Sequence, residues 1–240
     1  MRKHSGGGRP FVSAVIVAAG SGSRMGGINK QFLELRGIPV VVRSMLAFEN
    51  APCIDEIVAV VRPQEIGELK ALAEEYGVSK LSVIAAGGAT RQESVWKGIG
   101  AVSPRAEYAA VHDGARPFVR PEEISRCLEA AEACGGAALG VPVKDTIKRV
   151  DENGVILSTP ERAGLWQAQT PQIFHLQRYR QAAELARRQG LDLTDDCQLM
   201  ERAGTAVRMA MGSYENIKIT TPEDIALAEG ILQRREEDTD

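Results

Sequence analysis

Residues 15–32, VIVAAGSGSRMGGINKQF, decide the fold and point to the chemistry. An apolar run over residues 12–18 breaks here into a glycine-rich loop that carries Arg24 and ends in Lys30. A short apolar run that ends in a turn is typical of a strand buried on both faces of a parallel sheet. Glycines let backbone N–H groups approach a ligand closely. Two cations on such a loop indicate a polyphosphate site.

Two common nucleotide motifs do not fit this loop. The dinucleotide pattern G-x-G-x-x-G would place its third glycine at Met25, which weakens a dinucleotide-dependent oxidoreductase as an alternative. The Walker pattern requires Lys-Ser/Thr directly after Gly27, where Ile28 and Asn29 stand. The loop therefore predicts phosphate binding but does not identify the ligand.

The composition narrows the class of protein. The 240 residues fit one large α/β domain or two small ones. A net charge of −3 argues against a general nucleic-acid binder, and no apolar run approaches the ~18 residues of a membrane span. The four cysteines form no C-x-x-C pair, so we expect free thiols in a reducing cytoplasm.

Strand-like and helical patterns alternate along the chain, which predicts βαβ units and a parallel sheet. The predicted strands cover residues 12–18, 56–61, 81–85, 108–112, 137–143, 206–211 and 216–220. The predicted helices cover residues 39–48, 64–75, 91–102, 121–134, 175–189, 195–203 and 221–235.

A hairpin interrupts this alternation. Asn153-Gly154 lies between β-branched runs at residues 146–150 and 155–159, which is a strong hairpin signal. We expect the hairpin to project from the domain as an arm. Projecting arms often pack on a partner subunit, so we expect a homodimer.

Ligands of open α/β sheets bind beyond the carboxyl ends of strands, so the loops there are candidate sites. One such loop carries Gly87 and Gly88 and leads into a helix start with Arg91 and Ser94. A helix N-terminus of this kind can bind an anion or a nucleotide, although Thr90 there also reads as a plain helix cap.

The next loop, His112-Asp113-Gly-Ala-Arg116, offers a carboxylate of the type that Mg²⁺ uses, often through water. A simple Asp113–Arg116 turn bridge is the alternative. We expect His112 to be a packed, hydrogen-bonded histidine rather than a catalyst. Further along, Lys218 stands in an apolar strand pattern, where a lysine is costly unless it has a partner.

Taken together, the segments resemble the cytidylyltransferase family that makes CDP-methylerythritol in non-mevalonate isoprenoid synthesis. The matching pieces, in family order, are AAGSGSRM with KQF, GGATRQESV, VHDGARP, VPVKDTIK, ERAGLWQAQTPQ, LTDDCQLME and NIKITTPEDIALAE. Any one piece is weak evidence, whereas the ordered series is specific.

The resemblance implies an α/β fold with a Rossmann-like, mostly parallel sheet, helices on both faces and a projecting β-hairpin arm. It implies a single nucleotidyltransferase domain over residues 11–235, with a dimerisation arm at about 142–164. Residues 1–10 would be a flexible leader, and residues 236–240 would fray. The reaction implied is that of CTP with 2-C-methyl-D-erythritol 4-phosphate, with Mg²⁺ as cofactor.

The family motifs also imply residue roles. Residues implied to bind CTP are Ala18, Ala19, Gly20, Gly22, Ser23, Gly87, Gly88, Arg91, Ser94, Asp113, Gly114 and Ala115, with Asp113 tied to Mg²⁺. Residues implied to bind the polyol phosphate are Arg116, Thr146, Arg162, Thr170, Thr194 and Lys218. The implied catalytic residues are Arg24, Lys30, Arg162 and Lys218, and Arg162 would come from the partner subunit.

Elementary chemistry agrees with this reading. Phosphoryl-type transfer needs alignment and charge neutralisation more than covalent help, and the cationic loops supply both. The histidines stand in no serine or cysteine nucleophile context, so we expect direct in-line attack without a covalent intermediate. The alternatives are another polyol phosphate as acceptor, such as ribitol 5-phosphate, or a nucleotide-binding protein that has lost catalysis.

Overall fold

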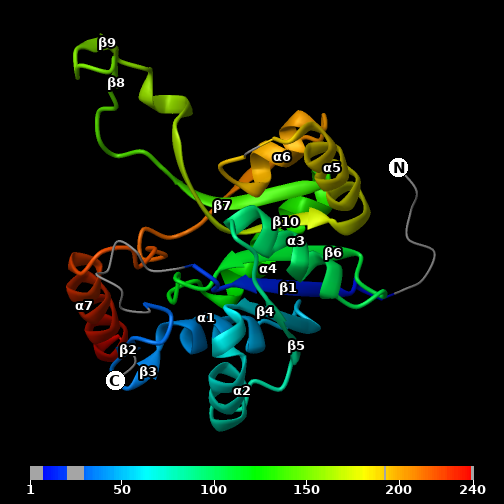
Figure 1. Ribbon diagram of the computed structural model, residues 1–240. Helices are drawn as coiled ribbons and strands as arrows, with labels where there is room; N and C mark the ends of the chain where they lie inside the picture. The colour runs from blue at the N-terminus through cyan, green and yellow to red at the C-terminus, as the bar shows by residue number, and fades with distance from the viewer. Residues whose placement is uncertain (1–7, 21–29, 192, 239–240) are drawn as a thin grey trace.

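A seven-stranded sheet forms the centre of the protein (Figure 1). The structure, a computed structural model, describes residues 8–20, 30–191 and 193–238. The strand order is β11-β7-β10-β6-β1-β4-β5. The strands are β1 (Val12–Val17), β4 (Glu56–Val61), β5 (Leu81–Ala86), β6 (Tyr108–Asp113), β7 (Gly136–Pro142), β10 (Trp166–His175) and β11 (Arg208–Met211). All neighbours pair in parallel except β10, which runs antiparallel to β6 and β7, so the expected mostly parallel sheet is confirmed.

Helices cover both faces of the sheet because its inner strands are apolar on both sides. In β1, Ile16 points into one hydrophobic cluster, and its neighbours Val15 and Val17 point into a second. The first cluster is covered by α1 (Val40–Glu49), α2 (Ile66–Glu75), which follows the short 3₁₀ turn η2 (Pro63–Glu65), and α4 (Pro121–Cys134). The second is covered by α3 (Arg91–Ala101), α5 (Leu176–Gln189) and α6 (Asp196–Arg202).

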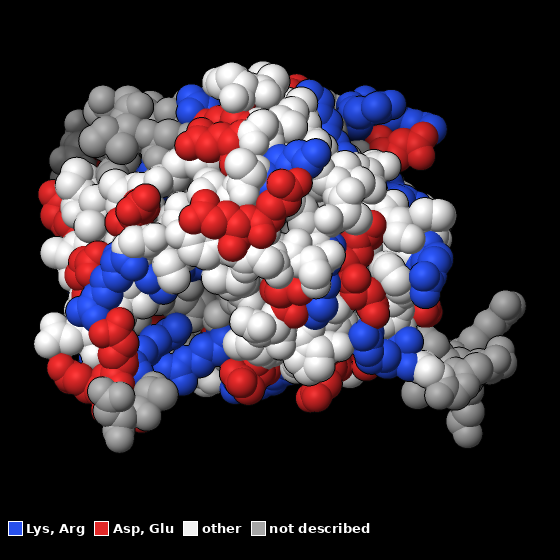
Figure 2. All heavy atoms as spheres, turned by 90° about the horizontal axis from the view of Figure 1, so that it is seen from below, with Lys and Arg blue, Asp and Glu red and all other residues white. Residues whose placement is uncertain are grey.

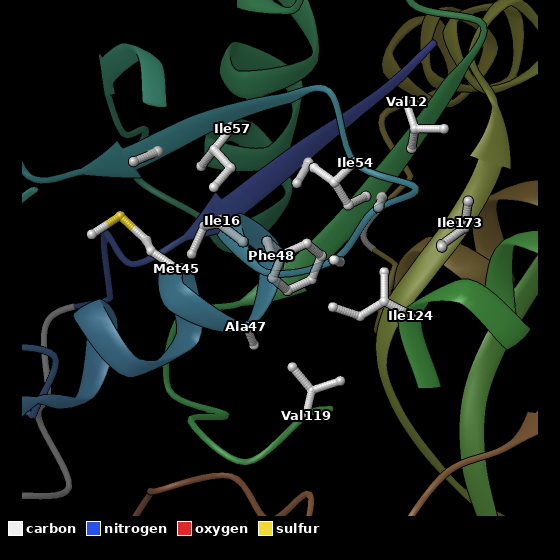
Figure 3. Close-up of a cluster of buried hydrophobic side chains, with 14 of the residues drawn as sticks. Val12, Ile16, Met45, Ala47, Phe48, Ile54, Ile57, Val119, Ile124 and Ile173 are labelled. Atoms are coloured by element: carbon white, nitrogen blue, oxygen red, sulfur yellow. The ribbon is translucent and has the colours of Figure 1, made fainter. Parts of the chain in front are cut away.

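The first cluster is built around the ring of Phe48. Figure 3 shows this ring among Ile16 of β1, Ile124 of α4 and Ile54 of the loop that joins α1 to β4. All four of these side chains are at most 1% exposed. Burying one such side chain stabilises the fold by about 2 kcal/mol, so the cluster fixes α1 and α4 firmly against the sheet.

A third, smaller cluster attaches the C-terminal helix. In α7 (Glu223–Glu237), Ile231 and Leu232 pack with Leu35 of the small hairpin formed by β2 (Glu34–Leu35) and β3 (Ile38–Pro39). Ile219 belongs to the same cluster. The helix therefore holds in place the segment that carries Lys218. It also extends two residues into the tail that was expected to fray.

Two predicted elements differ in the structure. Strand β10 was not predicted, because Pro171 and three glutamines interrupt its apolar pattern. Residues 216–220 were predicted as a strand, and this prediction is wrong: the segment is an irregular loop. Its apolar residues face the α7 cluster instead of a sheet, since Ile217 and Ile219 both pack there.

The predicted hairpin forms a separate two-stranded sheet, β8 (Arg149–Val150) with β9 (Ile156–Ser158), followed by the 3₁₀ turn η3 (Arg162–Gly164). Its turn contains Gly154 at φ +80°, the left-handed backbone that favours glycine. The arm projects from the body of the protein in Figure 1. Large apolar side chains are exposed along it, namely Ile147, Val150, Val155, Ile156 and Leu157.

Charges of both signs are mixed on the surface. On the face shown in Figure 2, acidic and basic side chains alternate without forming one large patch of either sign. Arg36, for example, pairs with Glu229 and Glu236 of α7. At the N-terminal end of the described chain, Arg9 pairs with Asp55 at 2.7 Å. Within the described residues, no helix combines the length and apolar character needed to cross a bilayer.

Candidate functional site

Asp113, the last residue of β6, lies at the centre of a cluster of cations at the carboxyl end of the sheet. Its Oδ2 accepts a hydrogen bond from Lys218 Nζ at 2.7 Å, and its Oδ1 accepts one from Arg91 Nε at 3.1 Å. Arg116 Nε lies 3.8 Å from Oδ2. The side chain of Asp113 is only 11% exposed. Three predicted site residues from distant parts of the chain thus converge on one carboxylate.

The electrostatics of the cluster keep this carboxylate charged. Burial alone would raise the pKa of Asp113, but the charges of Arg91 and Lys218 outweigh it and hold the pKa well below its usual value. Burial lowers the pKa of Arg116, and Asp113 offsets part of that effect. Burial alone would lower the pKa of Arg91, but the charges of Asp196 and Asp113 outweigh this effect and raise the pKa above its usual value. At neutral pH, Asp113 is therefore an anionic partner for its neighbours.

Hydrogen bonds join the loop that follows β6 to the loop that carries Lys218. Arg116 Nη1 donates to the carbonyl of Asn216 at 2.7 Å, and the Ile219 N–H donates to the carbonyl of Ala115 at 2.8 Å. Asn216 is fully buried, and its Nδ2 donates to the carbonyl of Thr170 in β10 at 3.0 Å. Lys218 therefore has the partner that its apolar surroundings require, and the partner is Asp113.

His112 precedes Asp113 in β6, and Thr170 contacts the backbone of Asp113. Thr170 Oγ1 accepts from the Asp113 N–H at 3.0 Å and lies 3.0 Å from His112 Nδ1. The hydroxyl therefore donates to Nδ1, which leaves Nε2–H to donate to the carbonyl of Arg116 at 3.1 Å. Burial lowers the pKa of His112 to about 4, so the ring is neutral. His112 is a packed histidine, as expected, and Thr170 supports the site by holding the Asp113 backbone and the His112 ring.

Glycines allow the strand ends to approach one another. A Cβ on Gly87 would lie 2.3 Å from the Cβ of Ala19, and one on Gly114 would lie 3.0 Å from the Cβ of Ala18. Side chains at either position would separate the turns that follow β1, β5 and β6. Backbone N–H and C=O groups are thus gathered beside the cation cluster, where a nucleotide could bind.

The turn at Gly88 is held by the helix that follows it. Ser94 Oγ accepts from the Gly88 N–H at 3.0 Å and donates to the Thr90 carbonyl at 2.9 Å. Thr90 caps α3 by accepting from the Glu93 N–H, as the sequence predicts, while Glu93 Oε2 accepts from the Ala89 N–H. Ser94 is 2% exposed, so it positions the turn with its side chain facing inward.

Several predicted site residues lie away from the Asp113 cluster or outside the described residues. Thr146 and Arg162 are exposed on the arm, where Arg162 Nη1 donates to the carbonyl of Lys144 at 2.5 Å. Thr194 is exposed, and its N–H donates to Gln198 Oε1 at 3.1 Å. Three further residues, Gly22, Ser23 and Arg24, lie outside the described residues. Lys30 is described and half-buried, and Gly20 precedes the gap.

Three residues that support the cluster had no predicted functional role. Asp196 Oδ2 accepts from Arg91 Nη1 at 2.9 Å, and Tyr179 donates to Asp196 Oδ1 at 2.6 Å. Gln172 Oε1 accepts from the Asp196 N–H at 3.1 Å. Asp196 follows Thr194 in a family motif and could have been selected from it. Tyr179 occupies an apolar helix position, which carries no such signal.

The donor set around Asp113 limits how a metal could bind. Among residues 8–20, 30–191 and 193–238, no group of three or more His, Cys, Asp or Glu side chains could hold a metal ion. Both oxygens of Asp113 already accept from Arg91 or Lys218. Mg²⁺ in such sites commonly takes one carboxylate and several phosphate oxygens. The residues present fit an ion held chiefly by nucleotide phosphates, with Asp113 contacting it through water.

Comparison with known proteins identifies close relatives along nearly the whole chain. A protein of Halalkalibacterium halodurans named 2-C-methyl-D-erythritol 4-phosphate cytidylyltransferase is 47% identical over 225 residues, which is 93% of this chain and 98% of that protein. A protein of the same name from Desulforamulus reducens is 44% identical over 226 residues, 93% of this chain and 97% of the relative.

Solved structures agree with the sequence comparison. The crystal structure of 4-diphosphocytidyl-2C-methyl-D-erythritol synthase from Anaerococcus prevotii matches with a TM-score of 0.85 and 32% identity, covering 93% of this chain and 96% of that one. The cytidylyltransferase structure from Thermus thermophilus matches at 0.75 and 33% identity, covering 93% and 99%. The family described as IspD, 2-C-methyl-D-erythritol 4-phosphate cytidylyltransferase, matches residues 12–234, and the chain belongs to it.

Proposed function

We propose that the protein transfers the cytidylyl group of CTP to 2-C-methyl-D-erythritol 4-phosphate and releases pyrophosphate. The observation that carries the proposal is the convergence of Lys218, Arg116 and Arg91 on Asp113, beside the close-packed turns at Gly87 and Gly114. Family membership supports the same substrates. Ribitol 5-phosphate as acceptor is not favoured by the relatives' names.

The chemistry requires no group on the protein to become covalently attached. An oxygen of the acceptor's phosphate attacks the α-phosphorus of CTP, the bond from that phosphorus to the bridging oxygen breaks, and pyrophosphate leaves with the bonding electrons. The attacking oxygen is already an anion, so no general base is needed. His112, which precedes Asp113 in β6, is neutral and has both ring nitrogens engaged. Direct in-line attack therefore remains the mechanism we favour.

The residues divide into two groups by the phosphate that each would meet. Lys218 and Arg116 would bind the acceptor's phosphate, since both are cations beside Asp113, with side chains 36% and 13% exposed. Arg24 and Lys30 would neutralise charge that builds on the α-phosphate. Backbone groups at Ala18 to Gly20 and at Gly87, Gly88, Gly114 and Ala115 would line the nucleotide side.

We propose Mg²⁺ as the cofactor. When bound, the ion would neutralise the triphosphate and make pyrophosphate a better leaving group. Asp113 would hold it through water, because Arg91 and Lys218 occupy both carboxylate oxygens.

We propose a homodimer in which the arm packs on a second copy. The arm exposes Val155 at 60%, Ile156 at 58% and Leu157 at 55%, and such a run of exposed apolar side chains indicates an interface. Arg162 and Thr146 lie on the same arm and would enter the acceptor site of the partner.

The four cysteines are free, which supports a reducing cytoplasmic location.

A pyrophosphate-release assay with CTP and each polyol phosphate tests the function. We expect turnover with 2-C-methyl-D-erythritol 4-phosphate and a preference of at least tenfold in kcat/KM over ribitol 5-phosphate. Lys218→Met should raise the KM for the acceptor. The control Lys70→Met should not, because it removes an exposed cation of α2 that does not belong to the Asp113 cluster. Turnover of ribitol 5-phosphate alone would refute the acceptor, and CTP binding without turnover would refute the enzyme.

A further inference from the structure

A buried polar chain runs from the Asp113 cluster into the core. Arg91 Nε donates to Asp113 and its Nη1 donates to Asp196 Oδ2 at 2.9 Å. Asp196 Oδ1 accepts from the Tyr179 hydroxyl at 2.6 Å. Tyr179 is fully buried and Asp196 is 5% exposed, so the inner part of this chain is shielded from water. Shielding strengthens each charged hydrogen bond and makes a missing partner costly.

The guanidinium of Arg91 joins the two carboxylates of this chain. A guanidinium is planar and rigid, so fixing Nη1 on Asp196 also fixes the direction of Nε. Nε in turn holds Oδ1 of Asp113, whose other oxygen holds Lys218. With Nε and Nη1 committed to carboxylates, Arg91 bridges two anions rather than pointing these donors at a ligand.

The inner end of the chain is itself firmly placed. The Tyr179 ring packs against Phe174 of β10 with ring centroids 5.6 Å apart. Asp196 begins α6, and Gln172 Oε1 accepts from its backbone N–H and from that of Cys197, both at 3.1 Å. Burial first, and then the neighbouring Asp196 charge, raise the pKa of Tyr179 well above its usual value, so its hydroxyl stays a donor.

We propose that Tyr179 and Asp196 are positioning residues that act through Arg91 to hold Asp113, and thereby Lys218, in the geometry that binds the acceptor's phosphate. The inference rests on the proposed function and extends it to residues that touch no substrate. It assigns to the Tyr179 hydroxyl, one atom in an otherwise apolar helix face, an effect on acceptor binding alone.

Tyr179→Phe tests the chain because it removes only the hydroxyl and keeps the ring. We expect the KM for the acceptor to rise about tenfold, the size expected for losing one hydrogen bond to a charged group, while the KM for CTP changes less than twofold. Tyr108→Phe is the matched control, since Tyr108 is also buried and begins the strand that ends at Asp113. It should leave both KM values unchanged.

A purely structural role for Tyr179 would give another pattern. Loss of folded protein lowers kcat in proportion to the active fraction and leaves both KM values as they were, so that result would overturn the proposal. If Tyr179→Phe does not fold, Asp196→Asn is the second variant. It keeps an acceptor for the Tyr179 hydroxyl and removes the charge that holds Arg91, so we expect the same selective rise in acceptor KM.

A double-mutant cycle makes the test decisive. Arg91→Lys replaces the rigid fork with a single point charge, which cannot hold Asp113 and Asp196 in a fixed relation. In this background Tyr179→Phe should change the acceptor KM by less than twofold, because the chain is already broken. A full additional tenfold change would overturn the chain while leaving the function intact. Absence of turnover by the wild-type protein would instead overturn the function, and this inference with it.

Discussion

The neutral state of His112 predicts how the stability of the protein depends on pH. The ring is fully buried, and it packs against Phe48 with centroids 4.8 Å apart. Its Nδ1 accepts from Thr170, and its Nε2–H donates to the carbonyl of Arg116. A second proton would have to displace the Thr170 hydroxyl hydrogen from Nδ1. Protonation is therefore opposed by burial and by the hydrogen bonds of the neutral ring.

The size of the effect follows from the two pKa values. Burial lowers the pKa of His112 from 6.5 to about 4, so between these values the unfolded chain binds a proton that the folded protein does not. The free energy of unfolding therefore rises with pH across this window. The part of it that comes from the neutral His112 ring is lost as pH falls below 6.5. Between pH 7 and pH 4.5 the loss from this one group is about 2 kcal/mol.

Urea unfolding at a series of pH values between 4.5 and 7 measures this loss. His112→Gln cannot titrate, so we expect its free energy of unfolding to be lower at pH 7 and to fall about 2 kcal/mol less than that of the wild type on acidification. Ile54→Val, a core substitution that removes one buried methyl group, should shift the curve without changing its slope. Parallel curves for the wild type and His112→Gln would refute the reasoning.

Three further predictions concern the proposed reaction and the proposed dimer. Arg24→Ala or Lys30→Ala should lower kcat about 10²-fold, as expected for losing one transition-state charge contact, and a change confined to the KM for CTP in steady-state kinetics would contradict this role. Ile156→Asp places a charge on the exposed apolar arm, so size-exclusion chromatography should show loss of the dimer; an unchanged dimer would exclude this part of the arm from the interface. If Arg162 serves the partner's site, mixing an inactive Arg162→Ala protein with an inactive Lys30→Ala protein should restore part of the pyrophosphate release, whereas a site built within one subunit gives no recovery.

Most of the sheet could be predicted from the sequence because its inner strands are apolar on both faces. Residues 12–18 and 56–61 are apolar apart from Ser13 and Glu56, and β1 and β4 occupy almost these residues. Strand β10 escaped prediction for the opposite reason. Its polar residues have local tasks: Gln172 caps the start of α6, and Thr170 holds Asp113 and His112. A strand whose side chains serve a site loses the pattern by which strands are recognised.

The loop around Lys218 shows a second limit of sequence patterns. Alternating apolar residues at 217 and 219 indicate a strand, but the same spacing here serves packing against α7. The prediction that Lys218 needs a partner did not depend on secondary structure, and it is confirmed by the ion pair with Asp113 at 2.7 Å. An energetic requirement was thus more reliable than the pattern around it.

The charge of the cluster explains why Asp113 is needed before any substrate arrives. Arg91, Arg116 and Lys218 would repel one another if brought together alone, and Asp113 and Asp196 offset two of their three charges. One positive charge remains in excess, which favours an incoming phosphate dianion. Because the side chain of Arg116 is only 13% exposed, much of the cost of removing water from it is already met by folding. The carboxylate thus acts as a counter-ion that keeps the cations assembled, and in the proposed function the acceptor's phosphate would join Lys218 and Arg116 without a rearrangement of the strands that carry the cluster.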